Sequence, residues 1–367
     1  MTSPSSDVGR GLPLGLQSAI NQRDVERVRQ LLAEGAEPNG PRRFPLLHRS
    51  IKHGALDIVR MLVDAGADIE RVDHAGWTPL TRADADERAE IIDFLLDAGA
   101  DPSALTRHGF APLHRAVRAG DPTRCSLLLG KGADVNARSA DGSTALLLAA
   151  RTCDTTLSEL LLRTLLDHQA DPDLGDDDGW VPLAWAAYED AAHADFGGDR
   201  IVRVPQLLQA GADPNAGTYP PLLSSLSEEG RTWAVTDMLI RAGANPDAVD
   251  DLGTTLLLRA LQVTTDGEFI VRCAAVVSDV TPAANDGTTP VDEALARWSS
   301  DPTGEDSVDP LLALRSAGVD LSVAADQIPG WLREPGDELS PNAPPDATLR
   351  FGHLRRVFRE TRDELRT

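Results

Sequence analysis

The side chains best placed for chemistry in this sequence are the carboxylates between Asp171 and Asp178. Aspartates at alternating positions, as at Asp171 and Asp173, are typical of loops that bind calcium. The run nevertheless lacks the frame, the central glycine and the closing glutamate of such a loop. The spacing therefore does not predict a metal site, and we expect neither a metal ion nor a cofactor.

A histidine among carboxylates is the second arrangement that could support catalysis. His193 stands near Asp190, Asp195 and Asp199, and an enzyme with its site in an inserted loop would have to use this group. The motifs G-x-S-x-G, H-E-x-x-H, G-x-G-x-x-G and the Walker loop are absent from the sequence. Catalysis has no other support in the sequence, so we expect a protein that is not an enzyme.

The three cysteines are odd in number and form no C-x-x-C pair. We expect Cys125, Cys153 and Cys273 to be small buried residues in a reducing compartment. No nearby histidine makes Cys125 a plausible nucleophile.

The charge balance is strongly acidic, with 58 Asp and Glu residues, 35 Lys and Arg residues and a formal net charge of −23. This excess argues against nucleic-acid binding over most of the chain and favours solubility or a basic partner. The N-terminal segment lacks the apolar core of a secretory signal, and no apolar run reaches the ~18 residues that span a membrane. We expect a cytoplasmic protein, and the composition, rich in arginine and alanine, is typical of a bacterial gene.

A short motif recurs along the chain and predicts the elements that must position these side chains. Gly66, Gly99 and Gly132 are each followed by Ala-Asp and stand 33 residues apart. Related copies of the motif begin at Gly35, Ala170, Gly211, Gly243 and Gly318. Self-similarity at a step of this size predicts a stack of small units, each of which buries its apolar face against its neighbours.

A second motif opens the units, as in residues 76–80 (GWTPL) and 109–116 (GFAPLHRA). Followed by two short helical patterns and Gly-Ala-Asp-x-Asn, it resembles the ankyrin repeat. The resemblance implies a β-turn and an antiparallel helix pair in each unit, with proline in the first helical turn and a threonine such as Thr78 as its cap.

The resemblance also implies that His48 and His114 join neighbouring turns through hydrogen bonds. Where Thr81, Leu147 or Ala184 stands instead of histidine, we expect a weaker junction.

The resemblance covers residues 12–330 in about nine units and predicts an all-α ankyrin-repeat solenoid. Residues 1–11 are expected to be a flexible N-terminus. Insertions near residues 189–200 and 298–309 are expected to form loops on one face. Residues 331–348 are predicted to be a Pro-rich acidic linker.

Residues 349–367 are predicted to form an amphipathic C-terminal helix with one apolar side and six arginines. The helix could cap the apolar end of the last repeat, as repeat stacks require. It could instead be a tethered recognition helix for a partner or an acidic surface. We favour the cap because the linker is long enough to fold back.

In the family, the turn tips and first helices form the concave face on which partners usually dock. Trp77, Phe110 and Trp180 directly follow turn glycines, and Tyr188 and Tyr219 are expected on the same face of later units. Large aromatic side chains on a rigid surface are typical interface anchors. They could alternatively pack over their own turns, but we predict that they contact a partner.

Charge along this face is divided between early and late units. The early units carry the basic residues Lys52, Arg107, Arg118 and Arg151. The later units carry the acidic residues Asp176, Asp177, Asp178, Glu189, Asp190, Glu228 and Glu229. A basic segment of a partner could be steered to the acidic part.

The sequence therefore predicts a non-catalytic, monomeric scaffold that binds a partner protein on the concave face. The expected contact residues are Trp77, Phe110, Arg118, Arg151, Trp180, Tyr188, Glu189 and Tyr219. One alternative is an acidic inhibitor of a basic nucleic-acid-binding protein, which would depend on Asp176–Asp178, Glu189 and Asp190. The other, less favoured, is an enzyme with its site in the inserted loops.

Overall fold

The computed structural model describes most of the chain, and all its regular elements there are helices. It covers residues 12–41, 45–106, 108–194, 201–226, 233–300, 309–319 and 345–364, with single residues at 321, 332, 339 and 343. The expected N-terminal tail, most of the expected linker and Arg107 lie outside the described residues. The chain divides into two compact units, residues 1–149 with 163–170 (unit 1) and residues 150–162 with 171–367 (unit 2).

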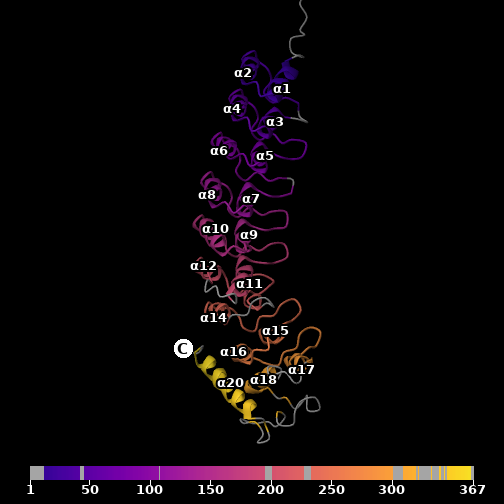
Figure 1. The fold of residues 1–367 in the computed structure, drawn as a ribbon, viewed down its shortest axis with the longest axis vertical. Helices are drawn as coiled ribbons and strands as arrows, with labels where there is room; N and C mark the ends of the chain where they lie inside the picture. The colour runs from indigo at the N-terminus through magenta and orange to yellow at the C-terminus, as the bar shows by residue number, and fades with distance from the viewer. Residues whose placement is uncertain are drawn as a thin grey trace, which may run out of the picture. The chain divides into compact units, whose positions relative to one another are not determined.

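Unit 1 is a series of antiparallel helix pairs. These are α1 (Leu12–Gln22) and α2 (Val25–Ala33), α3 (Leu46–Lys52) and α4 (Leu56–Asp64), α5 (Pro79–Ala85) and α6 (Ala89–Asp97), α7 (Pro112–Arg118) and α8 (Pro122–Gly130), followed by α9 (Ala145–Ala150). The first helices α1, α3, α5 and α7 pack on one another, and the second helices form a separate layer (Figure 1). Helix α10 (Thr155–Asp167) contributes residues to both units.

The helices form where the sequence motifs place them. Thr78 accepts a hydrogen bond from the backbone N–H of Thr81 and caps α5, with Pro79 in the first turn. Helix α4 buries Ile58, Val59 and Leu62, and each such side chain stabilises the stack by roughly 2 kcal/mol. Packing between repeats, rather than helix propensity, therefore holds these short helices.

The second helix of a repeat ends at the recurring glycine. Gly132 has a φ of 88°, its N–H donates to the carbonyl oxygen of Leu129, and the N–H of Ala133 donates to Leu128. Gln169 occupies the same place after α10 with a φ of 64°. The turn is thus kept where the glycine is lost, at the cost of a left-handed conformation in a residue that disfavours it.

The loop after each second helix is bonded to the loop of the next repeat. Asn39 Oδ1 accepts from the N–H of Asp68, and Ser103 Oγ accepts from the N–H of Asp134, each at 2.8 Å. In unit 2, Asn215 Oδ1 accepts from the N–H of Asn245 at 2.7 Å. The polar residues of the Gly-Ala-Asp-x-Asn motif therefore fix the register between repeats.

The predicted histidine junctions are confirmed in unit 1. His48 Nε2 lies 2.7 Å from the carbonyl oxygen of Trp77, and His114 Nε2 lies 3.1 Å from that of Ser143, one repeat further on in each case. His114 Nδ1 also accepts from the N–H of Ala111. The Thr81 hydroxyl instead bonds within its own turn, to the backbone N–H and carbonyl oxygen of Thr78.

Unit 2 continues the pattern with longer and less regular pairs. Its helices are α11 (Pro182–Ala194), α12 (Arg203–Gln209), α13 (Pro221–Ser224), α14 (Trp233–Arg241), α15 (Leu256–Val263), α16 (Gly267–Val276), α17 (Pro290–Ser300), α18 (Asp309–Ser316) and α20 (Pro345–Glu364). The first helices α11, α13, α15 and α17 pack on one another in that order.

The C-terminal helix α20 packs against the second helices α16 and α18 (Figure 1). It begins at Pro345, within the stretch assigned to the linker, and its apolar side buries Phe351, Leu354 and Val357. A Cβ atom at Gly267 would lie 3.1 Å from Asp309 Cβ and 3.3 Å from Leu354 Cδ1. The absence of a side chain at Gly267 thus permits the close approach of α16, α18 and α20.

Candidate functional site

Four aromatic side chains gather on the first-helix side of unit 2. The rings of Trp180 and Tyr219 are stacked with centroids 4.4 Å apart, and Trp185 lies 4.7 Å from Trp180 on a tilted plane. Tyr188 meets Trp185 edge to face at 5.9 Å, and the Arg151 guanidinium lies 4.5 Å from the Trp185 ring centre. Packing of this kind fixes each ring against its neighbour and makes the surface rigid.

An open cavity of about 560 Å³ lies beside these rings. Its wall includes Trp180, Tyr188, Tyr219, Leu223 and Val263. We call this cavity the aromatic pocket. Apolar and aromatic walls with a few fixed polar groups are typical of binding sites.

The fixed polar groups of the aromatic pocket are Asp250 and Arg259. Arg259 Nη2 donates to Asp250 Oδ2 at 2.8 Å, and Asp250 Oδ1 accepts from the N–H groups of Leu252 and Thr254. The Asp250 side chain is nearly buried, whereas that of Arg259 is one-third exposed. The carboxylate thus holds its own turn and orients the guanidinium at the edge of the pocket.

The turn before α11 sets the position of Trp180. Asp176 Oδ1 accepts from the Trp180 N–H at 2.9 Å, and the Asp176 N–H donates to the Trp180 carbonyl oxygen at 2.9 Å. The neighbouring turn is attached through Thr218, whose N–H donates to the Gly179 carbonyl oxygen. The two turns that carry Trp180 and Tyr219 are therefore joined and held by hydrogen bonds.

A buried ion pair joins α11 to α12 across the insertion. Asp190 Oδ1 accepts from Arg203 Nη1 at 2.9 Å, and Asp190 Oδ2 accepts from the N–H groups of Arg203 and Val204 at 2.9 Å. Arg203 also donates to Ser158 Oγ and the Thr152 carbonyl oxygen. Both charged side chains are fully buried. Burial raises the pKa of Asp190. The hydrogen bonds oppose this shift because they favour the charged form of the carboxyl group.

This ion pair corrects two expectations about Asp190. The residue was expected on the acidic surface of an inhibitor and beside His193 in an enzyme, but it is enclosed and paired with Arg203. The His193 side chain, Asp195 and Asp199 lie outside the described residues, as do Glu228 and Glu229. Asp190 thus holds the helix pair together and is not available at the surface.

The predicted contact residues of unit 1 are half-buried or exposed on turn tips and first helices. The Phe110 ring meets His114 edge to face at 6.2 Å, and the exposed Arg118 places its guanidinium 5.5 Å from the Phe110 ring centre. Trp77 is held by Asp73 Oδ1, which accepts from its N–H at 3.0 Å.

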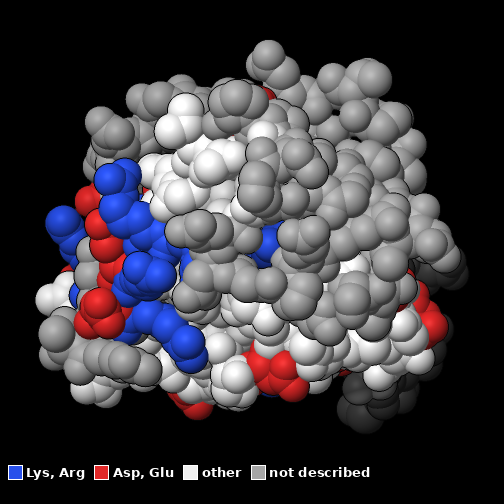
Figure 2. Space-filling model, turned by 90° about the horizontal axis from the view of Figure 1, so that it is seen from below, with Lys and Arg blue, Asp and Glu red and all other residues white. Residues whose placement is uncertain are grey.

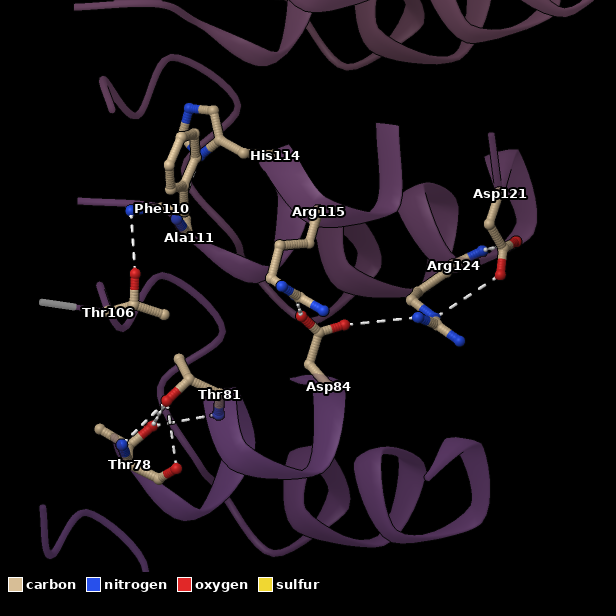
Figure 3. A network of polar contacts seen from close by, with 10 residues as sticks. All are labelled: Thr78, Thr81, Asp84, Thr106, Phe110, Ala111, His114, Arg115, Asp121 and Arg124. Atoms are coloured by element: carbon tan, nitrogen blue, oxygen red, sulfur yellow. Dashed lines mark hydrogen bonds and ion pairs between the residues drawn. The ribbon is translucent and has the colours of Figure 1, made fainter. Parts of the chain in front are cut away.

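A cluster of charged groups joins α5 to the next repeat where the histidine junction is absent. Asp84 accepts from Arg115 Nε of α7, and Arg124 Nη1 of α8 lies 3.3 Å from its other oxygen (Figure 3). Asp84 is buried, while Arg115 and Arg124 are partly exposed. Burial raises the pKa of Asp84, and the two guanidinium groups oppose this shift.

Unit 1 also carries a cavity on its first-helix side, with a volume of about 550 Å³. Its cationic lining residues are Arg49, Lys52 and Arg82, and His48, His53 and His74 also line it. Asp73 is the one carboxylate among the described residues of this lining. Burial and the nearby cations Arg23, Arg49 and Lys52 lower the pKa of His53. We call this cavity the basic pocket.

The structure brings together four of the eight predicted contact residues: Arg151, Trp180, Tyr188 and Tyr219. Glu189 is half-buried on the same helix as Tyr188. Phe110 and Arg118 form a separate pair in unit 1. Sequence reasoning missed Trp185, although its spacing of three residues from Tyr188 places both on one helix face.

The cysteines and the described carboxylates do not form a chemical centre. Burial raises the pKa of Cys125 to about 12 and also raises that of Cys273, so neither thiol is a ready nucleophile. The expectation that all three cysteines are buried is wrong for Cys153, which is exposed. Among the described residues, no three His, Cys, Asp or Glu side chains are grouped to hold a metal ion. No described helix is long and apolar enough to cross a bilayer.

The comparison with protein families agrees with the helix pairs and turns described above. Residues 16–106 and 113–218, more than half of the chain, match the family model described as ankyrin repeats (3 copies). The chain belongs to the ankyrin repeat family. The helix pairs α13/α14, α15/α16 and α17/α18 extend the pattern beyond the matched residues.

Two curated mammalian proteins are similar to part of this ankyrin-repeat chain. Protein phosphatase 1 regulatory subunit 27 of Homo sapiens is 37% identical over 78 residues, which are 20% of this chain and 49% of the relative. Its counterpart in Mus musculus is 36% identical over 78 residues, with the same coverage. The chain thus spans about half the length of the curated relatives it matches.

Proposed function

We propose that this ankyrin-repeat protein is a non-catalytic scaffold that binds a partner protein on its turn tips and first helices. The aromatic pocket of unit 2 is the principal contact, and an apolar side chain of the partner enters it beside Trp180 and Tyr219. The observation that carries the proposal is the rigid group of half-buried rings around an open cavity of about 560 Å³. Aromatic residues fixed in this way provide contact area with little further loss of conformational entropy.

The relatives support binding as the general role. Their names describe regulatory subunits of protein phosphatase 1, that is, proteins that act together with another protein. We extend to this chain only the role of binding another protein.

The acidic inhibitor is a weaker proposal than the scaffold. Asp190, one of its five expected contact residues, is enclosed by Arg203. Asp177 and Asp178 remain exposed at the turn before Trp180. They would favour a partner whose apolar anchor is followed by a basic residue.

Photo-crosslinking tests the proposed face. Benzoylphenylalanine placed at Tyr219, in the aromatic pocket, is expected to crosslink the partner in the native cell extract. The matched control is Leu160, which is 44% exposed on α10, a second helix. Crosslinking from the Leu160 position and not from Tyr219 would overturn the proposed face, and no protein crosslink from either would argue against a scaffold.

A further inference from the structure

The packing of α20 leaves three of its arginines on the outer side of the helix. Because Phe351, Leu354 and Val357 are buried against α16 and α18, the opposite face is turned to solvent. The exposed arginines are Arg356, Arg359 and Arg362, which we call the arginine stripe. Figure 2 shows a continuous band of basic side chains on the side where α20 lies, with acidic side chains beside it.

Two side-chain contacts hold α20 against its neighbouring helices. Arg350 Nη1 lies 3.1 Å from Asp309 Oδ1, and His353 Nε2 lies 3.3 Å from Glu268 Oε2. Glu268 is also paired with Arg272 of its own helix. These contacts attach the N-terminal half of α20 to α16 and α18.

The stripe arginines are held differently. The guanidinium of Arg362 lies 5.5 Å from the Phe358 ring centre. Arg356 Nη2 lies 3.1 Å from His353 Nδ1 of the same helix. Arg356 reaches the carboxylate of Glu360 only at 3.9 Å with both side chains largely exposed, and such an ion pair contributes little. In the part of the chain that the structure describes, no carboxylate lies within ion-pair distance of Arg359 or Arg362.

The spacing of the stripe defines what it can contact. Arg356, Arg359 and Arg362 stand at positions i, i+3 and i+6 and so follow one another on successive turns over about 9 Å of helix. A partner helix with carboxylates at the same spacing would place one opposite each arginine. The guanidinium fork favours carboxylates, and the ring contact of Arg362 limits the entropy lost on pairing.

Long polyanions fit the stripe less well than a short acidic helix. The protein carries a net charge of −23, and Glu360 and Asp363 border the stripe on α20 itself. A nucleic acid or an anionic bilayer would extend over this acidic surface and be repelled by it. A short helix can be attracted locally, since screening at physiological salt limits the repulsion to about 8 Å.

We propose that the arginine stripe of α20 is a second interaction surface, separate from the repeats, that binds an acidic helical segment of a partner protein. This surface lies on the second-helix side of unit 2 and does not depend on the aromatic pocket. A partner held there would leave the first-helix side accessible.

The test uses the full-length protein and a synthetic helical peptide with glutamates at i, i+3 and i+6. Wild type is expected to bind this peptide more tightly than a peptide of the same composition with scrambled spacing, and more weakly as salt is raised. The variant Arg356→Ala/Arg359→Ala/Arg362→Ala should lose about ten-fold or more in affinity, since several charge pairs are removed together. Alanine favours the helix, so α20 should remain folded.

The control removes the same charge elsewhere. Arg27→Ala/Arg29→Ala/Arg241→Ala deletes three exposed arginines of α2 and α14 and should bind the glutamate peptide like wild type. Equal binding by the stripe variant and wild type would overturn the proposal, as would equal losses in the two variants. Tighter binding of duplex DNA or phosphatidylserine vesicles than of the glutamate peptide would also overturn it.

Discussion

The basic pocket of unit 1 and the aromatic pocket of unit 2 are built on turns and first helices of the same kind, yet their linings differ. The first is lined by Arg49, Lys52 and Arg82, and the second by Trp180, Tyr188 and Tyr219. Their volumes are nearly the same, about 550 and 560 Å³. The repeat framework therefore fixes where a cavity forms, and the side chains that differ between these repeats decide what it can bind.

The two units also differ in how they are held together beside these pockets. In unit 1, Asp84 pairs with arginines that still reach solvent. In unit 2, Asp190 and Arg203 are both fully buried. Removal of one partner of an enclosed pair leaves an uncompensated charge, so the consequences should be larger in unit 2.

The largest expected effect separates these two ion pairs. Asp190→Ala should lower the free energy of unfolding of unit 2 by about 3–5 kcal/mol. Asp84→Ala should cost unit 1 about 1–2 kcal/mol, because Arg115 and Arg124 can turn to water. Hydrogen exchange measured as a function of urea separates the two losses, with the α11 and α12 amides reporting on unit 2 and the α7 and α8 amides on unit 1.

A double variant provides the control for this comparison. Asp190→Ala/Arg203→Met removes both charges and should recover part of the loss. Equal losses from Asp190→Ala and Asp84→Ala would show that the difference in burial does not matter.

The pH dependence of stability should be stronger in unit 1. Burial lowers the pKa of His48 and His114, so both stay neutral in the folded unit, whereas they take up protons below about pH 6.5 when unfolded. The unfolded state then binds more protons, and stability falls as pH drops below 6.5. Asp84 in unit 1 and Asp190 in unit 2 have raised pKa values. At lower pH these carboxyl groups bind more protons in the folded state than in the unfolded state, so they increase stability as the pH falls, in both units.

Hydrogen exchange at pH 7.5 and 5.5 checks this difference between the units. Protection of the α7 and α8 amides should fall more than that of α15 and α16. His114→Gln should reduce the pH dependence of unit 1, although it also lowers its stability at pH 7.5. A similar fall in both units would contradict the assignment to the histidines.

The smallest expected effect is a gain in the stability of unit 1. His48 Nδ1 is buried, and no hydrogen-bond donor among the described residues reaches it. Pro45, at the N-cap of α3, cannot donate because proline has no N–H. In the equivalent place Ala111 donates to His114 Nδ1 at 3.1 Å. Pro45→Thr supplies both the N–H and a capping hydroxyl, each worth about 1 kcal/mol.

Loss of the proline also stabilises the unfolded chain by about 0.5 kcal/mol, so the net gain in stability from Pro45→Thr should be about 1.5 kcal/mol. The Pro45 backbone, with φ of −59° and ψ of 138°, is accessible to threonine. Thermal unfolding measures the gain, and Pro45→Ala isolates the contribution of the N–H. A loss of stability in both variants would show that the Nδ1 atom is satisfied in some other way.

The framework could be predicted from the sequence because its signals repeat. Thr78, His114 and the glycines after the second helices each act within one repeat or on the next, so a motif carries the whole contact. The departure from histidine at Thr81 was also visible in the sequence. The Asp84 cluster that joins the same two repeats was not visible there. That cluster depends on Arg115 and Arg124, 31 and 40 residues further on, and no motif links them.

The aromatic pocket could be predicted only in part. Trp180 and Tyr188 follow from the turn and the first helix of one repeat, but the 4.4 Å stack with Tyr219 needs the geometry of the next repeat. The acidic composition of residues 171–199 suggested a charged surface and concealed the role of Asp190. Its partner Arg203 lies beyond an insertion, where the regular step no longer predicts which residues meet.

The most direct test of the proposed docking surface is the affinity of the purified protein for the partner identified by crosslinking. Trp180→Ala should weaken binding about thirty-fold, as expected when an interface anchor worth about 2 kcal/mol is removed. Trp233→Ala, which removes a half-buried tryptophan of the second helix α14, should leave the affinity within about two-fold of wild type. Equal affinities for Trp180→Ala and wild type, with both proteins folded, would contradict the aromatic pocket as the docking site.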